Sequence, residues 1–244
     1  MDRLIYTAAS AARALMQRQD GLAHNLANAN TTGFRADEVV FRAVPVRGDG
    51  APTRVVSVEA TAGFDDAPGA IETTGRNLDV AIHGKGWLAL QAADGSEAYT
   101  RSGALQVTAE GQLVSPGGMP VAGEGGPITV PPDAVVSIAA DGTVSARSGN
   151  ASVQQVGKLK LVNPDPSELR KGEDGLMRMA TGEDAAPDAS VRLTPGALEG
   201  SNVNVVDSMV GMIAASRQFE TQMKLLQNAE QNDQRAAQLL APAR

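Results

Sequence analysis

Residues 5–26, IYTAASAARALMQRQDGLAHNL, place apolar side chains at alternating spacings of three and four residues. The positions are Ile5, Ala8, Ala12, Leu15, Leu22 and Leu26, and only Gln19 interrupts the series. This spacing is typical of a coiled-coil seam, in which two helices bury a shared apolar stripe. It predicts a helix over about residues 3–31, roughly 40 Å long at about 1.5 Å per residue. Asp2 is expected to cap its start, and Gly33 to stop its end.

A second helical stripe lies near the C-terminus. The same spacing joins Met209, Met212, Ser216, Phe219, Met223 and Leu226, and Val205, Val206, Ile213 and Leu225 widen the apolar surface. Asn204 or Asp207 is expected to cap this helix. Neither helix can bury its stripe alone, so we expect the two to pair. A single pair would still leave Val206, Ile213 and Leu225 partly exposed, which predicts burial by neighbouring subunits and therefore assembly.

The sequence between the two stripes has no helical period and holds most of the 26 glycines. Its short apolar runs are separated by turn pairs such as Asp94-Gly95, Glu110-Gly111 and Asp141-Gly142, which are typical of β-hairpins. The expected fold class is α+β, with a discontinuous N- and C-terminal α-helical coiled-coil domain and a central, mostly antiparallel β domain. The expected divisions are an N-terminal helix in 1–35, an extended connector in 36–75, the β domain in 76–180, a return connector in 181–200 and a C-terminal helix in 201–244.

The composition excludes several classes of function. The 21 basic and 28 acidic residues give a formal charge of -7, and no Lys/Arg cluster occurs, so nucleic acid is not an expected partner. The absence of cysteine excludes disulfides, thiolate metal sites and thiol nucleophiles. Only 3% of residues are aromatic, so the core must be built mainly from Val, Leu, Ile and Ala.

The pattern of apolar runs argues against membrane insertion. No run of about 18 apolar residues occurs, so we expect no transmembrane helix. Arg13, Arg18 and Asp20 interrupt the stretch in which a signal peptide would have its apolar segment. Any export is therefore expected to proceed without a cleaved signal peptide.

The sequence shows no pattern typical of a catalytic or metal site. His24 and His83 have neither a second ligand four residues away nor the glutamate of a zinc motif. The acidic pair Asp65-Asp66 lacks the alternating spacing of calcium ligands and lies in loop-like sequence. We therefore expect no catalytic residue, no metal ligand and no cofactor.

Asparagines and methionines in the two helical segments indicate contacts with neighbouring subunits. Asn25, Asn28 and Asn30 cluster where the first helix should end, although asparagine is a poor helix former. Their amides, each with two donor hydrogens and an acceptor oxygen, are expected to bond neighbouring backbones in a packed lattice. Adaptable side chains such as Met209 and Met212 suit a surface that meets several different neighbours.

Four stretches also resemble motifs of the bacterial flagellar axial proteins, the rod and hook family. NLANANTTGFR at residues 25–35 resembles the N-terminal signature of that family, with His24 in place of the first asparagine, and LEGSNV at residues 198–203 resembles the C-terminal one. GRNLDVAIHGKGWLALQ at 75–91 and AYTRSGALQVTAEGQLV at 98–114 resemble the shared β-domain motifs. In these two motifs Trp87-Leu88 and Leu105 stand where phenylalanines are more usual.

This resemblance implies a non-enzymatic structural subunit. Such a subunit would be exported by the flagellar type III apparatus without a cleaved signal, and would polymerise in the periplasm with itself and other rod proteins into part of the drive shaft. The two ends of the chain are most similar to those of proximal-rod subunits. A distal-rod or hook-type protein is the nearest alternative, and a periplasmic carbohydrate-binding or hydrolytic β protein with helical tails is the alternative from another class.

The residues expected at the assembly interface are those of the two stripes and of the two terminal signatures. They are Ile5, Ala8, Ala12, Leu15, Leu22, Asn25, Leu26, Asn28, Phe34, Asn202, Asn204, Met209, Met212, Phe219, Met223 and Leu226.

Overall fold

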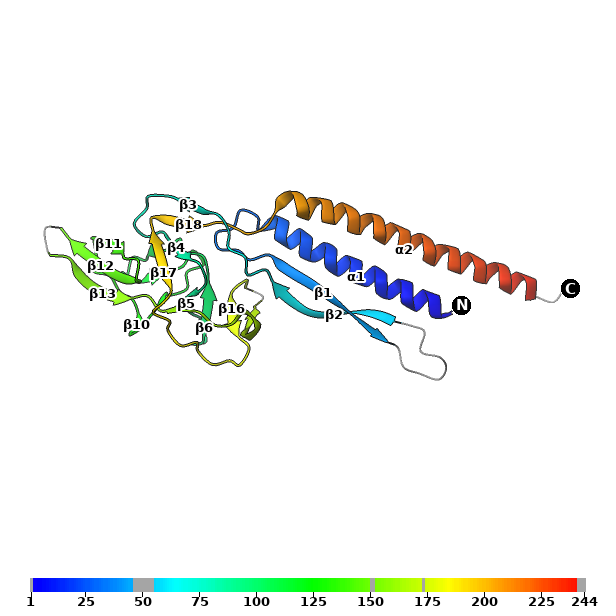
Figure 1. Ribbon diagram of the computed structural model, residues 1–244, viewed down its shortest axis with the longest axis horizontal. Coiled ribbons are helices and arrows are strands. Elements are labelled where there is room, and N and C mark those ends of the chain that lie inside the picture. Colours follow the sequence, from blue (N-terminus) through cyan, green and yellow to red (C-terminus); the bar gives the residue numbers. More distant parts are fainter. Residues whose placement is uncertain (1, 46–54, 150–151, 173, 241–244) are drawn as a thin grey trace. The chain divides into compact units, whose positions relative to one another are not determined.

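The structure is a computed structural model, which describes residues 2–45, 55–149, 152–172 and 174–240. The chain folds into two compact units (Figure 1). The helical unit comprises Met1–Ala27, Asp37–Phe64 and Asn204–Arg244, and the β unit comprises Asn28–Ala36 and Asp65–Val203. Each unit is therefore assembled from segments that are far apart in the sequence.

The helical unit contains two helices and one long hairpin. Helix α1 (Asp2–Ala27) packs against helix α2 (Val205–Leu240), and the two run antiparallel (Figure 1). This confirms the expected helix pairing, whereas the coiled-coil geometry stays a prediction. Strands β1 (Asp37–Pro45) and β2 (Val55–Phe64) form an antiparallel hairpin that also contacts α1. A Cβ on Gly21 would lie 2.9 Å from Cγ2 of Val39, so glycine at this position of α1 allows the strand to approach closely.

Helix α1 ends earlier than its sequence predicts. The expected helix continued to about residue 31, but the last helical residue is Ala27. Asn28 instead begins a turn, in which its backbone carbonyl accepts a hydrogen bond from the amide of Thr31 and its side-chain oxygen accepts one from the Thr31 hydroxyl, each 3.1 Å long. Asparagine side chains compete with helical hydrogen bonds in this way. Gly33 has the positive φ expected of a chain-stopping glycine, 69°, but it lies in the segment after this turn and not at the helix end.

The β unit contains short strands, and every pairing among its described residues is antiparallel, as the sequence predicts. A five-stranded sheet has the order β14-β5-β6-β16-β15, a three-stranded sheet has the order β11-β12-β13, and the remaining strands form the pairs β17-β4, β18-β3, β7-β8 and β10-β9. The bounds are β3 Ile71–Thr73, β4 Val80–His83, β5 Trp87–Gln91, β6 Glu97–Thr100, β7 Gln106–Val107, β8 Leu113–Val114, β9 Ala122–Gly123, β10 Gly126–Pro127, β11 Ala134–Ile138, β12 Thr143–Ser148, β13 Gln154–Lys158, β14 Leu161–Val162, β15 Leu169–Lys171, β16 Met177–Met179, β17 Arg192–Pro195 and β18 Ala197–Glu199. A single 3-10 turn, Pro166–Glu168, precedes β15.

The predicted hairpin turns connect paired strands. Asp94-Gly95 lies between β5 and β6, Glu110-Gly111 between β7 and β8, and Asp141-Gly142 between β11 and β12. All three glycines have positive φ, which glycine adopts without the steric cost that a Cβ would add.

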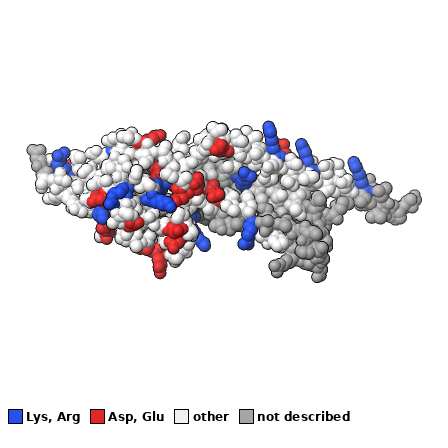
Figure 2. All heavy atoms as spheres, viewed as in Figure 1, with Lys and Arg blue, Asp and Glu red and all other residues white. Residues whose placement is uncertain are grey.

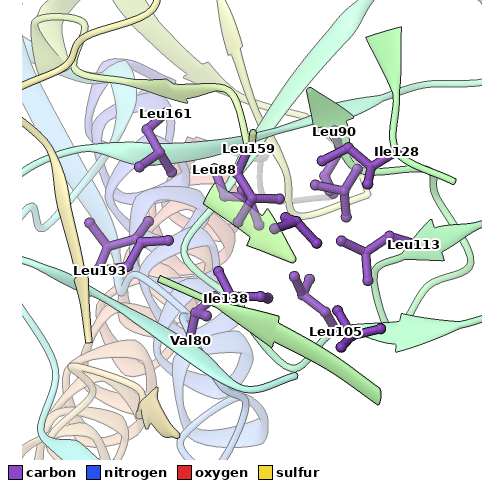
Figure 3. Packing of buried hydrophobic residues seen from close by; sticks show 14 of the residues in the cluster. Val80, Leu88, Leu90, Leu105, Leu113, Ile128, Ile138, Leu159, Leu161 and Leu193 are labelled. Carbon is purple, nitrogen blue, oxygen red and sulfur yellow. The ribbon is translucent and has the colours of Figure 1, made fainter. Parts of the chain in front are cut away.

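Aliphatic side chains fill the core of the β unit. The cluster in Figure 3 includes Val80, Leu88, Leu90, Leu105, Leu113, Ile128, Ile138, Leu159, Leu161 and Leu193, each at most 5% exposed. No aromatic side chain belongs to this cluster of described residues. The prediction of a core built mainly from small aliphatic side chains is thus confirmed.

Candidate functional site

An apolar face of α2 is uncovered in the helical unit. Val206, Met209, Val210 and Ile213 are 67%, 48%, 60% and 56% exposed, and their spacing of three and four residues places them on one side of the helix. We call these four residues the open face of α2. Val206, Ile213 and Leu225 are all exposed, as the sequence predicts for a single helix pair.

The other residues of the two predicted stripes are more protected. Ala8 and Ala12 are buried, and Leu15, Leu22, Leu26, Met212, Phe219 and Leu226 are half-buried. Met223 is exposed. The side chain of Ile5 lies outside the described residues. Asn204 fulfils its predicted capping role, because its side-chain oxygen accepts hydrogen bonds from the amides of Val206 and Asp207 at 3.0 and 3.2 Å.

Asn25 bonds the chain's own backbone. Its side-chain nitrogen donates to the carbonyl of Asp37 at 3.0 Å, and its side-chain oxygen accepts from the amide of Asp37 at 2.7 Å. The side chain thus pairs with the first residue of β1 as a neighbouring strand would. Asn25 is buried, so this pairing also satisfies its polar atoms.

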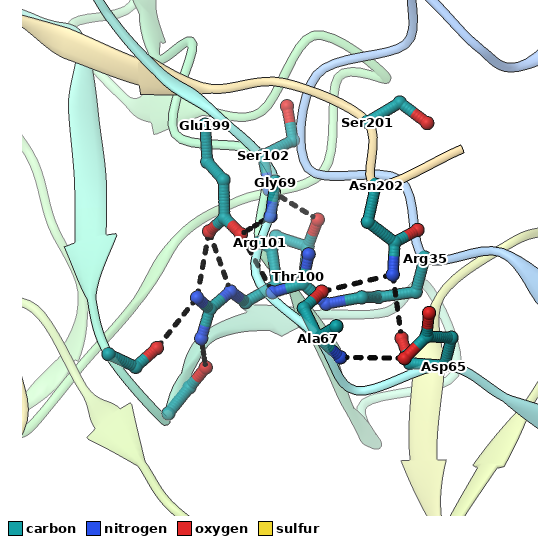
Figure 4. Close-up of polar contacts among 12 residues, drawn as sticks. Arg35, Asp65, Ala67, Gly69, Thr100, Arg101, Ser102, Glu199, Ser201 and Asn202 are labelled. Atoms are coloured by element: carbon teal, nitrogen blue, oxygen red, sulfur yellow. Dashed lines mark hydrogen bonds and ion pairs between the residues drawn. The ribbon is translucent and has the colours of Figure 1, made fainter. Parts of the chain in front are cut away.

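A buried ionic cluster in the β unit brings together residues of all four motifs (Figure 4). Glu199 lies between two arginines, and the side chains of all three residues are at most 2% exposed. Its Oε1 accepts from Nη2 of Arg35 at 2.7 Å and from the amide of Gly69 at 2.9 Å, and its Oε2 accepts from Nε of Arg101 at 2.8 Å. We call the segments that meet here, residues 33–36, 69, 101–103 and 199–202, the signature cluster.

The two arginines differ in how completely they are bonded. Besides its bonds to Glu199, Arg101 donates to the carbonyls of Gly86 and Gly84 at 2.6 and 2.7 Å. Burial lowers the pKa of Arg101, and the charge of Glu199 opposes that effect. By contrast, Nε and Nη1 of Arg35 are buried and have no hydrogen-bond partner among the described residues. The cluster therefore holds two guanidinium groups and one carboxylate, and Arg35 is the less completely bonded of the two arginines.

Backbone and aromatic contacts complete the signature cluster. The amide of Gly33 donates to the carbonyl of Glu199 at 2.8 Å. A Cβ on Gly33 would lie 2.3 Å from the backbone nitrogen of Ser102, so only glycine allows these segments to meet. The ammonium group of Lys171 lies 4.0 Å from the centre of the buried Phe34 ring and donates to the carbonyl of Arg35 at 3.1 Å.

The Asn202 side chain bonds three residues in two other segments of the β unit. Its side-chain oxygen accepts from the amide of Ala36 at 2.7 Å. Its side-chain nitrogen donates to the carbonyls of Asp65 and Ala67 at 2.9 and 3.0 Å, as Figure 4 shows. The sequence pointed to Phe34 and Asn202, but not to Arg35, Arg101 or Glu199. The available signal, for Arg35 and Glu199, was a charged residue within an otherwise apolar or small-residue motif, in GFR and LEG.

Comparison with known proteins identifies the family to which this chain belongs. A family model described as flagella basal body rod protein matches residues 5–35, the D1 domain of the flagellar hook protein FlgE/F/G matches residues 81–146, and the flagellar basal body rod FlgEFG protein C-terminal model matches residues 194–239. The flagellar basal-body rod protein FlgF of Escherichia coli (strain K12) is 48% identical over 250 residues, which cover 99% of each chain. The chain belongs to the FlgF family of flagellar basal-body rod proteins.

Other relatives support this placement in the FlgF family. The FlgF protein of Salmonella typhimurium (strain LT2) is 47% identical over 250 residues, again covering 99% of both chains. The basal-body rod protein FlgG of Bacillus subtilis (strain 168) is 30% identical over 255 residues, covering 95% of this chain and 96% of the relative. The identity of 48% and 47% to these two FlgF proteins, against 30% to this FlgG protein, favours the first interpretation of the sequence over its alternatives.

Two further findings concern membranes and metals. Neither helix in the described part of the chain combines the length and the apolar character that crossing a membrane requires. Among the described side chains, no three His, Asp or Glu residues are grouped closely enough to hold a metal ion.

Proposed function

We propose that this chain is a structural, non-enzymatic subunit of the flagellar basal-body rod, and that it polymerises through its helical unit. The observation that carries the proposal is the open face of α2, where four large apolar side chains are about half exposed or more. A contiguous apolar surface of this kind marks a protein interaction site. The names of the FlgF relatives identify the assembly as the basal-body rod.

The distribution of charge supports the same assignment. The segments of the helical unit contain equal numbers of acidic and basic residues, so the formal charge of -7 belongs entirely to the β unit. On the face shown in Figure 2, acidic side chains gather over the β unit. Zero net charge favours association, whereas a strongly charged surface keeps identical copies apart in solution. The helical unit is thus suited to packing against neighbours, and the β unit to remaining solvated.

The remaining parts of the proposal follow from the resemblance to rod proteins. The chain would take its place in the proximal rod, within the periplasm, after export by the flagellar type III apparatus without a cleaved signal peptide. Its partners would be further copies and other rod subunits. The stripe residues that are half-buried in the single chain, such as Met212, Phe219 and Leu226, would be covered further in the assembly.

The proposal is tested by placing a charge on the open face. Val210→Glu would set a carboxylate within the apolar contact, which costs several kcal/mol when it is buried without a partner. We expect the full-length variant to keep the circular dichroism spectrum of the parent and to fail to restore swimming in a bacterium that lacks its own FlgF-family protein. Val153→Glu is the matched control, because Val153 is 62% exposed in the β unit.

The two variants separate an assembly effect from a general effect of added charge. Loss of swimming, and of the subunit from purified basal bodies, for Val210→Glu alone supports assembly through α2. Normal swimming and normal incorporation of Val210→Glu would contradict the proposed role of the open face.

A further inference from the structure

The chain passes between its two units at four places, and the Asn202 side chain, which lies close to the last of them, bonds residues at two others. The chain leaves one unit and enters the other between residues 27 and 28, 36 and 37, 64 and 65, and 203 and 204. Asn202 itself lies two residues before the start of the helical segment that contains α2. Its side chain contacts Ala36, the last residue before β1, and Asp65, the first residue after β2.

No regular strand pairing joins these three segments. Ala36, Asp65 and Asn202 all lie outside the strands. Two backbone bonds link them, from Asp65 to the carbonyl of Ala36 at 2.9 Å and from Asn202 to the carbonyl of Phe34 at 3.3 Å. The Asn202 side chain adds three more, which use both of its donor hydrogens and its acceptor oxygen. The amide of this side chain therefore joins these segments by hydrogen bonds, as strand pairing would in a short sheet.

Asn202 differs from the buried arginines in what its loss would disturb. Glu199 and the two arginines are enclosed in the unit, and removing Glu199 leaves two buried positive charges without a carboxylate partner. Asn202 is only half-buried, so the groups that it bonds can reach water when it is removed. Its loss should loosen the three segments without unfolding the core.

We propose that Asn202 is a positioning residue for assembly: it ties the ends of the β1–β2 hairpin and the approach to α2 into one fixed arrangement. This inference rests on the proposed function, because the segments that it ties lead into the elements that pack in the rod. A chain without the tie would keep both its β core and its open face. In such a chain the segments around Ala36, Asp65 and Asn202 would adopt many arrangements. Ordering these segments on assembly would cost conformational entropy.

The test compares Asn202→Ala with Asn202→Asp and with Asn77→Ala in the full-length chain. Asn202→Asp keeps an acceptor for the amide of Ala36 but sets a carboxylate against the carbonyls of Asp65 and Ala67, so it should be no better than Asn202→Ala. Asn77 is an exposed asparagine of the same unit and serves as the matched control. Hydrogen exchange is followed in peptides covering residues 34–38 and 63–68 and, for comparison, in peptides from the core strands.

We expect exchange in the two edge peptides to become roughly tenfold faster in both Asn202 variants, as for the loss of a hydrogen bond of about 1.4 kcal/mol. Exchange in the core strands and the midpoint of thermal unfolding should stay close to those of the parent. Incorporation into basal bodies should fall sharply, whereas Asn77→Ala should behave as the parent in every assay.

Three results would overturn the inference. Unchanged exchange around Ala36 and Asp65 would show that the tie is absent. Faster exchange with normal incorporation would show that the tie does not serve assembly. A fall of more than about 8 °C in the unfolding midpoint, which is about 2–4 kcal/mol for a unit of this size, would make Asn202 a general stability residue. Failure of the proposed function itself is distinguished by Val210→Glu, which leaves the tie intact.

Discussion

Replacing Glu199 with glutamine should lower the free energy of unfolding of the β unit more than any other single isosteric change in the signature cluster. Glutamine has nearly the same shape, but it carries no charge to balance Arg35 and Arg101, whose side chains are 1% and 2% exposed. Breaking a buried ion pair by removing one partner costs about 3–5 kcal/mol. A loss of that size is a large part of the roughly 5–15 kcal/mol that stabilises a typical domain. For a unit of about 150 residues it lowers the unfolding midpoint by roughly 6–20 °C.

The reasoning is checked by comparing Glu199→Gln with Arg35→Met. Arg35→Met removes one of the two positive charges together with Nε and Nη1, which bond no other described residue, and it leaves one arginine paired with one carboxylate. It should therefore cost less than Glu199→Gln, because the buried pair of Arg101 and Glu199 stays intact and no buried charge is left without a partner of opposite sign. Urea unfolding followed by tryptophan fluorescence measures both changes, since Trp87 is buried in the β unit. Equal losses for the two variants would refute the view that the carboxylate is the limiting partner.

Three further changes have expected outcomes. Gly33→Ala should cost more than about 2 kcal/mol in urea unfolding, because it adds a backbone clash to the strain of a φ of 69°, whereas Gly75→Ala, with a φ of 72° and nothing within 4 Å of its Cβ, should cost only about 1 kcal/mol. Tyr99→Phe should cost about 1–3 kcal/mol at neutral pH, because the hydroxyl of Tyr99 accepts from the buried amide of Ala185 at 2.7 Å. Burial raises the pKa of Tyr99 to about 12, above the unfolded value of 10.0, so its contribution is complete below pH 10 and is lost as the pH rises toward 12; unfolding measured from pH 9 to 11 should be less pH-dependent in Tyr99→Phe. Asn204→Ala removes the cap of α2 and should reduce helix content by circular dichroism, at a cost of about 1 kcal/mol.

Local patterns predicted the elements of this fold because local interactions determine them. The spacing of three and four residues identified both helices, and Asp-Gly and Glu-Gly pairs identified hairpin turns, since helix periodicity and turn conformation depend on residues close in sequence. The predicted end of α1, at about residue 31, was wrong because the turn that begins at Asn28 replaces the last helical hydrogen bonds. The β1–β2 hairpin was expected only as extended chain, whereas in the structure its two strands pair with each other and contact α1.

The buried ionic cluster could not be predicted in the same way. Arg35 and Glu199 are 164 residues apart, and Arg101 and Glu199 are 98 apart, so no window of sequence contains a pair. Charged residues are usually exposed, and the sequence patterns assigned none of the three a role of its own. A signal of burial existed for Arg35 and Glu199, which adjoin apolar or glycine residues in motifs that otherwise lack charge. Arg101 lies between Thr100 and Ser102 and had no such signal.

The contacts within the signature cluster also explain which part of the structure is determined by the motifs that resemble those of rod proteins. Gly33 permits a close approach to Arg101, Glu199 balances the charge of that arginine, and Asn202 ties three segments together. All of these contacts lie within the β unit of a single chain. The motifs therefore specify how one subunit folds at its edge, and they leave open which neighbour it meets. The choice of neighbour must come from surfaces outside the motifs, and among the described residues the open face of α2 is the surface whose exposed apolar side chains would make that choice.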